Sequence, residues 1–199
     1  TIDWDYDTLL NLLWKRLCGC QPILLKSLFR EYSIKEDPNL GFIPTLLKDN
    51  HFELLKTLLG SYMGGNNKAF PYNWIQNHIK DTRDKIHPRT LIWLFSKSAE
   101  KQRQENKKEN KDLIDRVIRS RNMEEALTEV SKLKVGELKE EYPELKNIFE
   151  SLHKENNRSP ISEDELITIL KELSNEEPRK LIQKLIDMGV MQRYKPYNQ

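Results

Sequence analysis

Apolar side chains in this chain of 199 residues recur, in stretch after stretch, at the 3.6-residue spacing of an α-helix. Runs that alternate apolar and polar residues, as half-buried strands do, are nearly absent. A helix with one apolar face gains most of its stability by packing that face against another element. The spacing therefore predicts an all-α fold, with at least about 55% helix and with strand confined mainly to roughly the last fifteen residues.

Turn signals and apolar stripes divide the first half of the chain into predicted helices and loops. Asp7 is the expected N-cap of the first helix, and Pro88 opens the longest one at a position that proline favours. Polar loops are expected around Asp37-Pro38-Asn39 and from Gly60 to Pro71. The other predicted helices cover Pro22–Tyr32, Pro44–Lys48, Phe52–Leu59 and Tyr72–Thr82.

The stretch from Glu100 to Asn110 contains no large apolar residue. Such a stretch is either a solvated extension of the preceding helix or a linker. We place the first domain boundary there, which gives a helical, lid-like domain over residues 1–110. Two or three further helices over residues 111–156 form a predicted helical connector.

The remaining residues, 157–199, have the outline of a winged helix. Ser162–Glu165 has the S-x-x-E pattern of a capping box at the start of one helix, and Asn175 is expected to cap the next. Gly189 ends that second helix, and Val190–Tyr194 predicts a short strand. This order of elements predicts a truncated winged-helix-like domain, and plain helical packing is the alternative.

Charge and apolar content exclude several classes of protein. The 33 basic and 31 acidic residues leave a net charge of +2, which does not indicate a nucleic acid or a membrane as the partner. No run approaches the ~18 apolar residues of a membrane span, and no signal peptide opens the chain. Cys18 and Cys20 lack a second pair for a zinc site, so we expect free thiols in a cytoplasmic protein. We expect both ends to be cuts in a longer protein.

No complete catalytic or metal site is expected in this chain. Gly60 and Gly65 have the G-x-x-x-x-G spacing of a phosphate-binding loop, but Asn66 and Asn67 stand where lysine and serine or threonine are required. The four histidines follow no metal-ligand spacing, and neither a nucleophile elbow nor a zinc-binding helix motif is present. We therefore assign no catalytic residue and no metal ligand.

Two regions are candidates for contact with nucleic acid. Aromatic residues gather from Phe70 to Phe95, near a local excess of basic residues over 83–111, but aromatics at helical spacing are typical of a core. In the winged-helix segment, acidic residues slightly outnumber basic ones, which favours a protein partner over DNA. The candidate contacts of that segment to a nucleic acid or a protein are Arg179, Lys180 and Lys184.

Several motifs of the chain resemble a known family. Tyr62–Gly65, Tyr72–His78 and His87–Leu91 are together similar to the end of the ATPase module in a bacterial family of large P-loop ATPases, AAA-like or STAND-like in architecture. Glu125–Ser131, followed by Glu137–Pro143, resembles the helical connector downstream of that module. The winged helix of such proteins continues into a further strand and wing, which this chain lacks.

The resemblance implies that Arg89 is a sensor-2 arginine. In AAA-type lids a helix begins with Pro-Arg, and the arginine points at the γ-phosphate of ATP. ATP with magnesium is therefore the cofactor implied for the parent protein, whose Walker A and Walker B segments would lie upstream of Thr1, and none is implied for this chain alone. The Pro-Arg pair recurs at Arg179, so at least one copy is simply a good helix start.

Three functions are open on this evidence. The first is a regulatory C-terminal portion of a P-loop ATPase, which senses nucleotide state through Arg89 and couples it to a partner through the winged helix. Its partners would be the upstream ATPase core of the same protein and a protein, or DNA, at the winged helix, with oligomerisation left open. The second is a stand-alone helical nucleic-acid-binding protein, and the third is an adaptor with neither activity.

Overall fold

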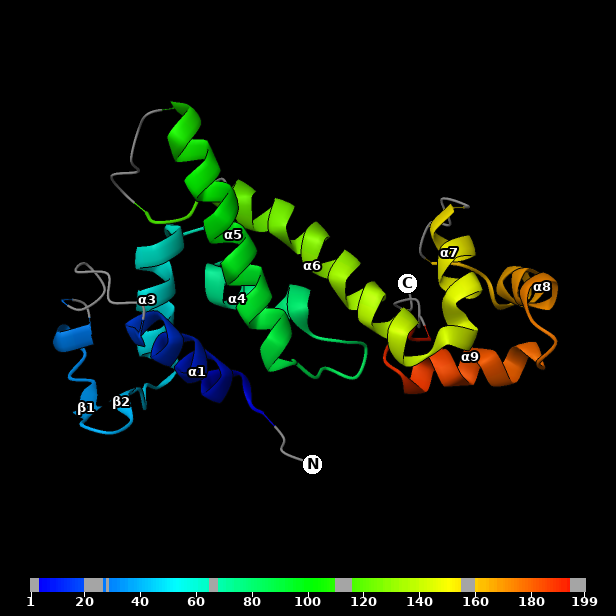
Figure 1. Cartoon of the computed structure of the whole chain (residues 1–199), viewed down its shortest axis with the longest axis horizontal. Coiled ribbons are helices and arrows are strands. Elements are labelled where there is room, and N and C mark those ends of the chain that lie inside the picture. Colours follow the sequence, from blue (N-terminus) through cyan, green and yellow to red (C-terminus); the bar gives the residue numbers. More distant parts are fainter. Residues whose placement is uncertain are drawn as a thin grey trace, which may run out of the picture. The chain divides into compact units, whose positions relative to one another are not determined.

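The fold is taken from a computed structural model of the chain (Figure 1), which describes residues 4–19, 27, 29–64, 68–109, 116–154 and 160–193. Helices account for 69% of the described residues and strands for 4%, which confirms the prediction of a mainly helical fold. The elements are α1 (Tyr6–Gly19), β1 (Lys35–Asp37), β2 (Gly41–Ile43), α3 (Lys48–Leu59), α4 (Pro71–Ile79), α5 (Pro88–Glu109), α6 (Ser120–Glu141), the 3₁₀ turn η1 (Pro143–Leu145), α7 (Lys146–Lys154), α8 (Glu163–Leu173) and α9 (Pro178–Asp187).

The chain forms two compact units, each with its own cluster of buried apolar side chains. Unit 1 comprises Thr1–Lys80 and Ile86–Val130, and unit 2 comprises Asp81–Lys85 and Ser131–Gln199. The division falls within α6, whereas the sequence placed domain boundaries after residues 110 and 156. The helix α6 is therefore shared, with its first half in unit 1 and its second half in unit 2.

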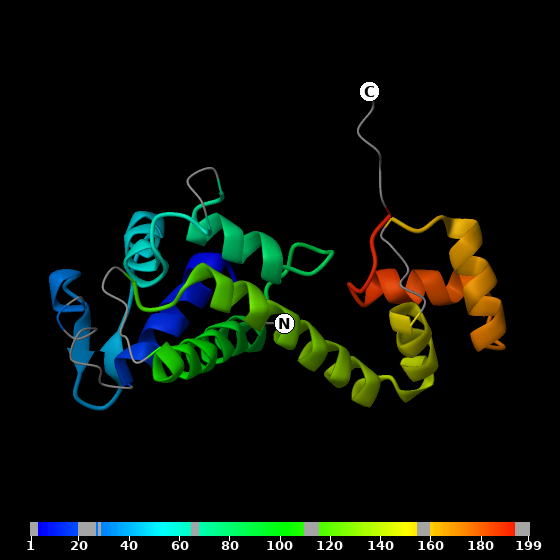
Figure 2. The same ribbon diagram turned by 90° about the horizontal axis from the view of Figure 1, so that it is seen from above.

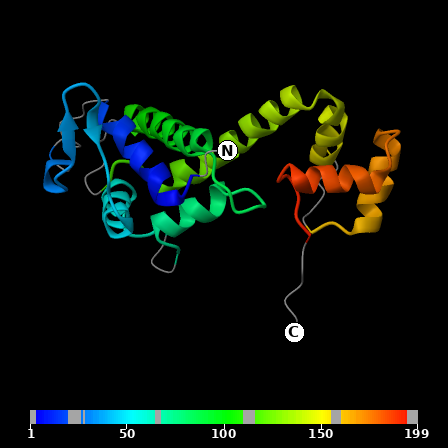
Figure 3. The same cartoon turned by 90° about the horizontal axis from the view of Figure 1, so that it is seen from below.

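The core of unit 1 is made by helices that cross one another (Figures 2 and 3). α1 packs on α3, α5 and β2, and α3 packs on α4. The first half of α6 adds a narrow apolar stripe to the same cluster. Among the fully buried side chains of this core are Leu10, Trp14, Leu55, Leu59, Ile75, Leu91, Leu94 and Met123.

The first helix begins two residues earlier than expected. Asp5, not Asp7, caps it: the carboxylate of Asp5 accepts hydrogen bonds from the hydroxyl of Thr8 (2.5 Å) and from its backbone N–H (2.8 Å). These bonds hold the pKa of Asp5 below its ordinary value. Asp7 instead accepts a hydrogen bond from the hydroxyl of Tyr72 (2.7 Å), which links the start of α1 to α4.

The helix predicted over Pro44–Lys48 is wrong. Leu46 is held to α1 by Asn11, whose side chain accepts from the Leu46 N–H (2.9 Å) and donates to the Leu46 carbonyl (3.2 Å). This pairing takes up the Leu46 carbonyl, which a helix over these residues would use, and α3 begins only at Lys48. The predicted helix Pro22–Tyr32 lies largely outside the described residues, although residues 29–31 are helical.

A small antiparallel hairpin occupies a region where the sequence indicated only a loop. β1 and β2 pair with Lys35 opposite Ile43 and Asp37 opposite Gly41. The Asp37 carboxylate accepts hydrogen bonds from the N–H groups of Asn39 and Leu40, both at 2.8 Å, and so closes the turn. The expectation of strand mainly near the C-terminus is therefore wrong for the described residues.

The helix that Pro88 opens continues to Glu109. From Glu100 to Glu109 the polar stretch is therefore an extension of that helix and not a linker. α5 and α6 are the longest helices, with 22 residues each. None of the helices in the described part of the chain is both long enough and apolar enough to cross a membrane.

In unit 2, α8 packs on α7 and on α9. Ser162 caps α8 as predicted, with its hydroxyl accepting from the Glu165 N–H at 3.2 Å, but α9 is preceded by Glu177 and not capped by Asn175. Gly189 ends α9 with a φ of +74°. The strand predicted over Val190–Tyr194 is not formed through residue 193, and Tyr194 lies outside the described residues.

Candidate functional site

The start of α5 presents Arg89, the residue that the resemblance marks as a nucleotide sensor. Pro88 occupies the first helical position, and the His87 carbonyl accepts hydrogen bonds from the N–H groups of Thr90 (3.0 Å) and Leu91 (3.4 Å). Thr90 and Leu91 are buried, whereas Arg89 is exposed. Buried neighbours thus fix the helix start, and the arginine stands on its exposed side.

Arg89 lies beside an aromatic ring one helical turn further on. The guanidinium carbon is 5.7 Å from the centroid of the Trp93 ring, within the range of a cation–π interaction. Trp93 is half-buried against the core of unit 1, so its ring is a fixed support. The first turn of α5 contains no acidic side chain that would offset the positive end of the helix dipole.

An anion is the ligand that this arrangement suits best. A guanidinium favours the oxygens of a phosphate or a carboxylate, and the positive end of the helix dipole acts in the same direction. A guanidinium stays protonated at neutral pH, so Arg89 can bind or orient a phosphate but cannot serve as a general base.

The candidate residues of α9 differ in their surroundings. Arg179 and Lys180 are exposed in the first turn. The Nζ of Lys184, by contrast, is 2.6 Å from Oε1 of Glu144 and 5.8 Å from the centroid of the Tyr142 ring. The hydrogen bond between Lys184 and Glu144 raises the pKa of the lysine and lowers that of the carboxyl. Lys184 therefore joins α9 to η1 within unit 2.

The loop with the G-x-x-x-x-G spacing follows a helix, whereas a phosphate-binding loop follows a strand. Gly60 ends α3 with a φ of +86°, a left-handed conformation that favours glycine, and its N–H donates to the Lys56 carbonyl at 2.7 Å. Met63 is buried and its N–H donates to the Ala69 carbonyl at 3.0 Å, which anchors the loop. Residues 65–67 lie outside the described residues.

We expect the chain alone to show no ATP turnover above a protein-free blank, because its loop offers neither the lysine nor the magnesium-binding hydroxyl of a phosphate-binding loop. Phosphate release measured for the chain and for its Lys68→Ala and Lys56→Ala variants checks this. Lys56 is the matched control, since it lies in the preceding helix. Turnover that Lys68→Ala abolishes and Lys56→Ala leaves intact would assign the loop a catalytic role.

The aromatic residues between positions 70 and 95 are mainly core residues, as their helical spacing predicted. Tyr72, Trp74 and Phe95 are all buried. Phe70 is 38% exposed, but its ring stacks on Tyr62 with a centroid distance of 4.9 Å. Most of this set is therefore packed within the protein and does not present free faces for base stacking.

A buried tryptophan–histidine pair, which no sequence pattern indicated, lies between α1 and α3. The indole N–H of Trp14 donates to Nδ1 of His51 at 2.8 Å, and both side chains are fully buried. Nε2 of His51 is buried and, among the described residues, has no partner that meets the geometry of a hydrogen bond. The Leu46 carbonyl still favours the protonated ring and so acts to raise the pKa of His51. Loss of solvation dominates and lowers the pKa of His51.

Metal-binding geometry is not found among the described residues, where no three His, Cys, Asp or Glu side chains are grouped to hold an ion. Cys18 is buried, and burial raises the pKa of its thiol to about 11. A thiol with so high a pKa is a poor nucleophile and a poor metal ligand at neutral pH. Cys20, the other half of the C-x-C pair, lies outside the described residues.

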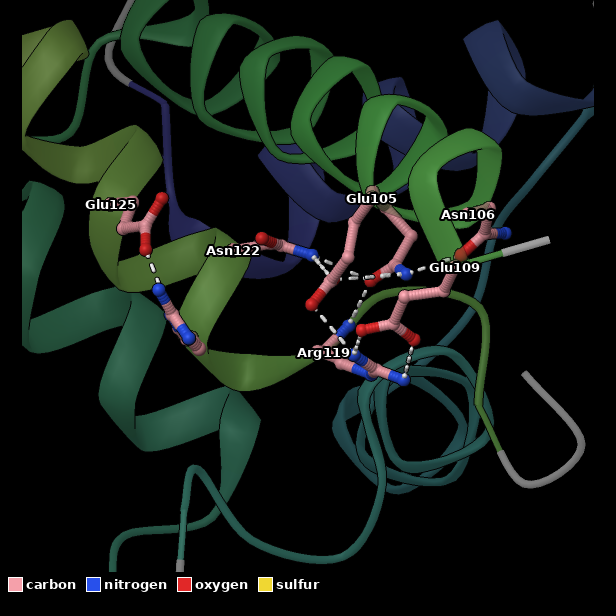
Figure 4. A network of polar contacts seen from close by, with 8 residues as sticks. Glu105, Asn106, Glu109, Arg119, Asn122 and Glu125 are labelled. Carbon is pink, nitrogen blue, oxygen red and sulfur yellow. Dashed lines mark hydrogen bonds and ion pairs between the residues drawn. The ribbon is translucent and has the colours of Figure 1, made fainter. Parts of the chain in front are cut away.

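A second feature that sequence reasoning missed is a network of polar contacts between α5 and the start of α6 (Figure 4). Gln102 and Asn122 are its buried members, and Glu105, Glu109 and Arg119 supply its charges. The polar stretch of α5 is the one visible signal, because Gln102 and Glu105 lie one turn apart there. Their partners are 14 to 20 residues away in sequence, and no local pattern specifies that pairing.

Among the described candidates, Arg89 combines exposure, a helix start and an aromatic support, whereas the α5–α6 network binds mainly its own members. Arg179 and Lys180 share the exposure and the helix start but have no recognised aromatic support among the described residues, so Arg89 is the residue on which the proposal below is built. Neither a family model, nor a curated protein, nor a solved structure matches the chain.

Proposed function

We propose that this chain is a regulatory C-terminal portion of a P-loop ATPase and that Arg89 senses the nucleotide bound by the rest of the parent protein. The observation that carries the proposal is that Arg89 is exposed at the start of α5. The hydrogen bonds of the His87 carbonyl and the burial of Leu91 fix this helix start. The resemblance of His87–Leu91 to the sensor region of such ATPases supports the same role.

In this proposal Arg89 contacts the γ-phosphate, and ATP with magnesium is bound by the parent's own ATPase core. Charge-assisted hydrogen bonds from a guanidinium to phosphate oxygens are strong and often bidentate. The stacking of Arg89 on Trp93 at 5.7 Å limits the positions that its side chain can take, so less conformational freedom is lost when the phosphate binds.

We further propose that unit 2 is winged-helix-like and passes the nucleotide state to a partner. α8 and α9 would supply its helix pair, and the exposed Arg179 and Lys180 at the start of α9 would be its contacts to a protein or to DNA. Lys184 is a weaker contact than the sequence indicated, because it is paired with Glu144. We place the parent protein in the cytoplasm.

The test of Arg89 needs the parent protein with its ATPase core. Arg89→Ala should reduce ATP hydrolysis or nucleotide response by about one to two orders of magnitude, the equivalent of one charge-assisted hydrogen bond of roughly 1.5–3 kcal/mol. Arg179→Ala is the matched control, because Arg179 also follows a proline in the first turn of a helix and is also exposed. If Arg179→Ala reduces hydrolysis and Arg89→Ala does not, the sensor is in unit 2 and the proposal fails.

A further inference from the structure

The second half of α5 meets the start of α6 through polar side chains. From Glu100 to Glu109, α5 has no large apolar residue, yet Gln102 in this stretch is only 3% exposed. On α6, Asn122 is 5% exposed and lies next to an apolar stripe of Met123, Ala126, Leu127 and Val130 that packs on the core. Between α5 and the start of α6, hydrogen bonds and charges add to what this stripe contributes.

Gln102 is the centre of the contact. Its side-chain oxygen accepts hydrogen bonds from the backbone N–H of Arg119 and from the side-chain amide of Asn122, both at 2.8 Å. Its amide nitrogen donates to the Asn106 side chain at 2.7 Å. Arg119 immediately precedes α6, so Gln102 satisfies one of the open N–H groups at the start of that helix from outside it.

Charges surround this centre. The Arg119 guanidinium is 2.6 Å from Glu105 and binds both oxygens of Glu109, at 3.0 and 3.2 Å. Asn122 donates to the other oxygen of Glu105 at 2.6 Å. One arginine thus neutralises part of the charge of two carboxylates on successive turns of α5, and its removal would take this cation away from both.

A second link runs between the same helices one turn away. The Nζ of Lys101 is 2.7 Å from Glu129 and 3.8 Å from Glu125, both on α6. Polar contacts between α5 and α6 thus extend from Lys101 to Glu109 along α5. Ion pairs between partly exposed side chains weaken as the salt concentration rises.

From this arrangement we propose that Gln102, Glu105, Glu109, Arg119 and Asn122 form a polar latch that holds the first half of α6 on the rest of unit 1 and can open while α1, α3 and α4 stay folded. Because α6 is shared between the units, the latch determines whether unit 2 is attached through an ordered helix or through a loosened one. The open state would differ from the closed one in the named hydrogen bonds and in the burial of Met123, Ala126 and Val130.

The latch also lies at the other end of the helix that begins with Arg89. A 22-residue helix is about 33 Å long, so α5 reaches from the sensor position to Glu105 and Glu109 as one rigid element. A change at Arg89 would then bias the latch through α5. This link rests on the proposed function, whereas the latch itself does not.

Hydrogen exchange of the full chain tests the latch. Arg119→Ala should increase amide exchange in the first half of α6, residues 120–130, by about 10- to 100-fold, as the loss of a charged hydrogen bond implies. Exchange in α1, α3 and α4 should stay within about twofold of the unaltered chain. Arg121→Ala is the control, because Arg121 is 79% exposed and its recorded ion pair is to Glu125 on the same helix.

Glu109→Gln is the milder variant, to be used if Arg119→Ala does not fold. Raised salt concentration should also increase amide exchange at the start of α6, because it weakens the same ion pairs. Unchanged exchange at the start of α6 in both variants, or an equal rise through α1, α3 and α4, would overturn the latch. The two proposals can fail separately. If exchange rises as expected but Arg89→Ala leaves the parent's ATP hydrolysis unaltered, the proposed function is rejected and the latch is retained.

Discussion

Replacing Trp14 by alanine is expected to lower the free energy of unfolding of unit 1 by about 3–5 kcal/mol, the usual cost of deleting a large buried aromatic side chain. Trp14 is fully buried where α1 packs on α3, and the indole N–H is the hydrogen-bond partner of His51. Alanine would leave a cavity and also an unpaired nitrogen in the core. This loss is a large fraction of the roughly 5–15 kcal/mol by which domains are stable.

Urea unfolding followed by tryptophan fluorescence measures this effect selectively. All four tryptophans of the chain, at positions 4, 14, 74 and 93, belong to unit 1, so three remain to report in the variant. Trp14→Phe is the matched control: it keeps most of the buried ring and removes the N–H, and should cost clearly less than Trp14→Ala. A loss below about 1 kcal/mol for Trp14→Ala would contradict the central place of this side chain in the core.

The helices of this fold could be predicted because their signals are local. The apolar spacing after Pro88, the S-x-x-E pattern at Ser162 and the glycine at position 189 each act within a turn or two of the chain, and the structure has α5, α8 and the end of α9 where these signals indicated. Pro88 stands at the start of its helix because proline lacks the N–H that the first turn leaves open in any case.

The errors arose where a distant residue decides the local structure. Pro44–Lys48 has a helical composition, but Asn11, 35 residues away, takes up both backbone groups of Leu46. The hairpin depends on a turn closed by Asp37, in strands of only three residues that are too short for alternation to be visible. A single sequence contains no direct record of such contacts.

The candidate sites divide in the same way. Arg89 could be located from sequence because a Pro-Arg pair marks a helix start, whatever the fold around it. The pairing of Lys184 with Glu144 joins residues 40 positions apart, and the latch joins α5 to α6 through residues 10 to 20 positions apart. Neither pairing could be predicted before the helices were placed, although the charged residues themselves were visible.

Acidification from pH 7.5 to 5 is expected to destabilise unit 1 through His51. Burial lowers the pKa of this histidine in the folded protein, although Asp7 and Asp5 act in the opposite direction. The unfolded chain has a histidine pKa of about 6.5 and therefore binds a proton at a pH where the folded chain does not. The contribution of His51 to the free energy of unfolding is complete above about pH 6.5. It is lost as the pH falls below that value towards the folded pKa, and each pH unit removes at most about 1.4 kcal/mol.

The window from pH 7.5 to 5 separates this effect from that of the carboxylates. Asp5, Asp37 and Glu144 have lowered pKa values in the folded chain, so their contributions are lost only at more acidic pH. His51→Asn is the matched variant, because asparagine can still accept a hydrogen bond from Trp14 but does not titrate. Urea unfolding at successive pH values should show a fall in stability for the unaltered chain and a flatter profile for His51→Asn. Equal slopes in the two proteins would mean that another group takes up the proton and that His51 is not the acid-sensitive element of this core.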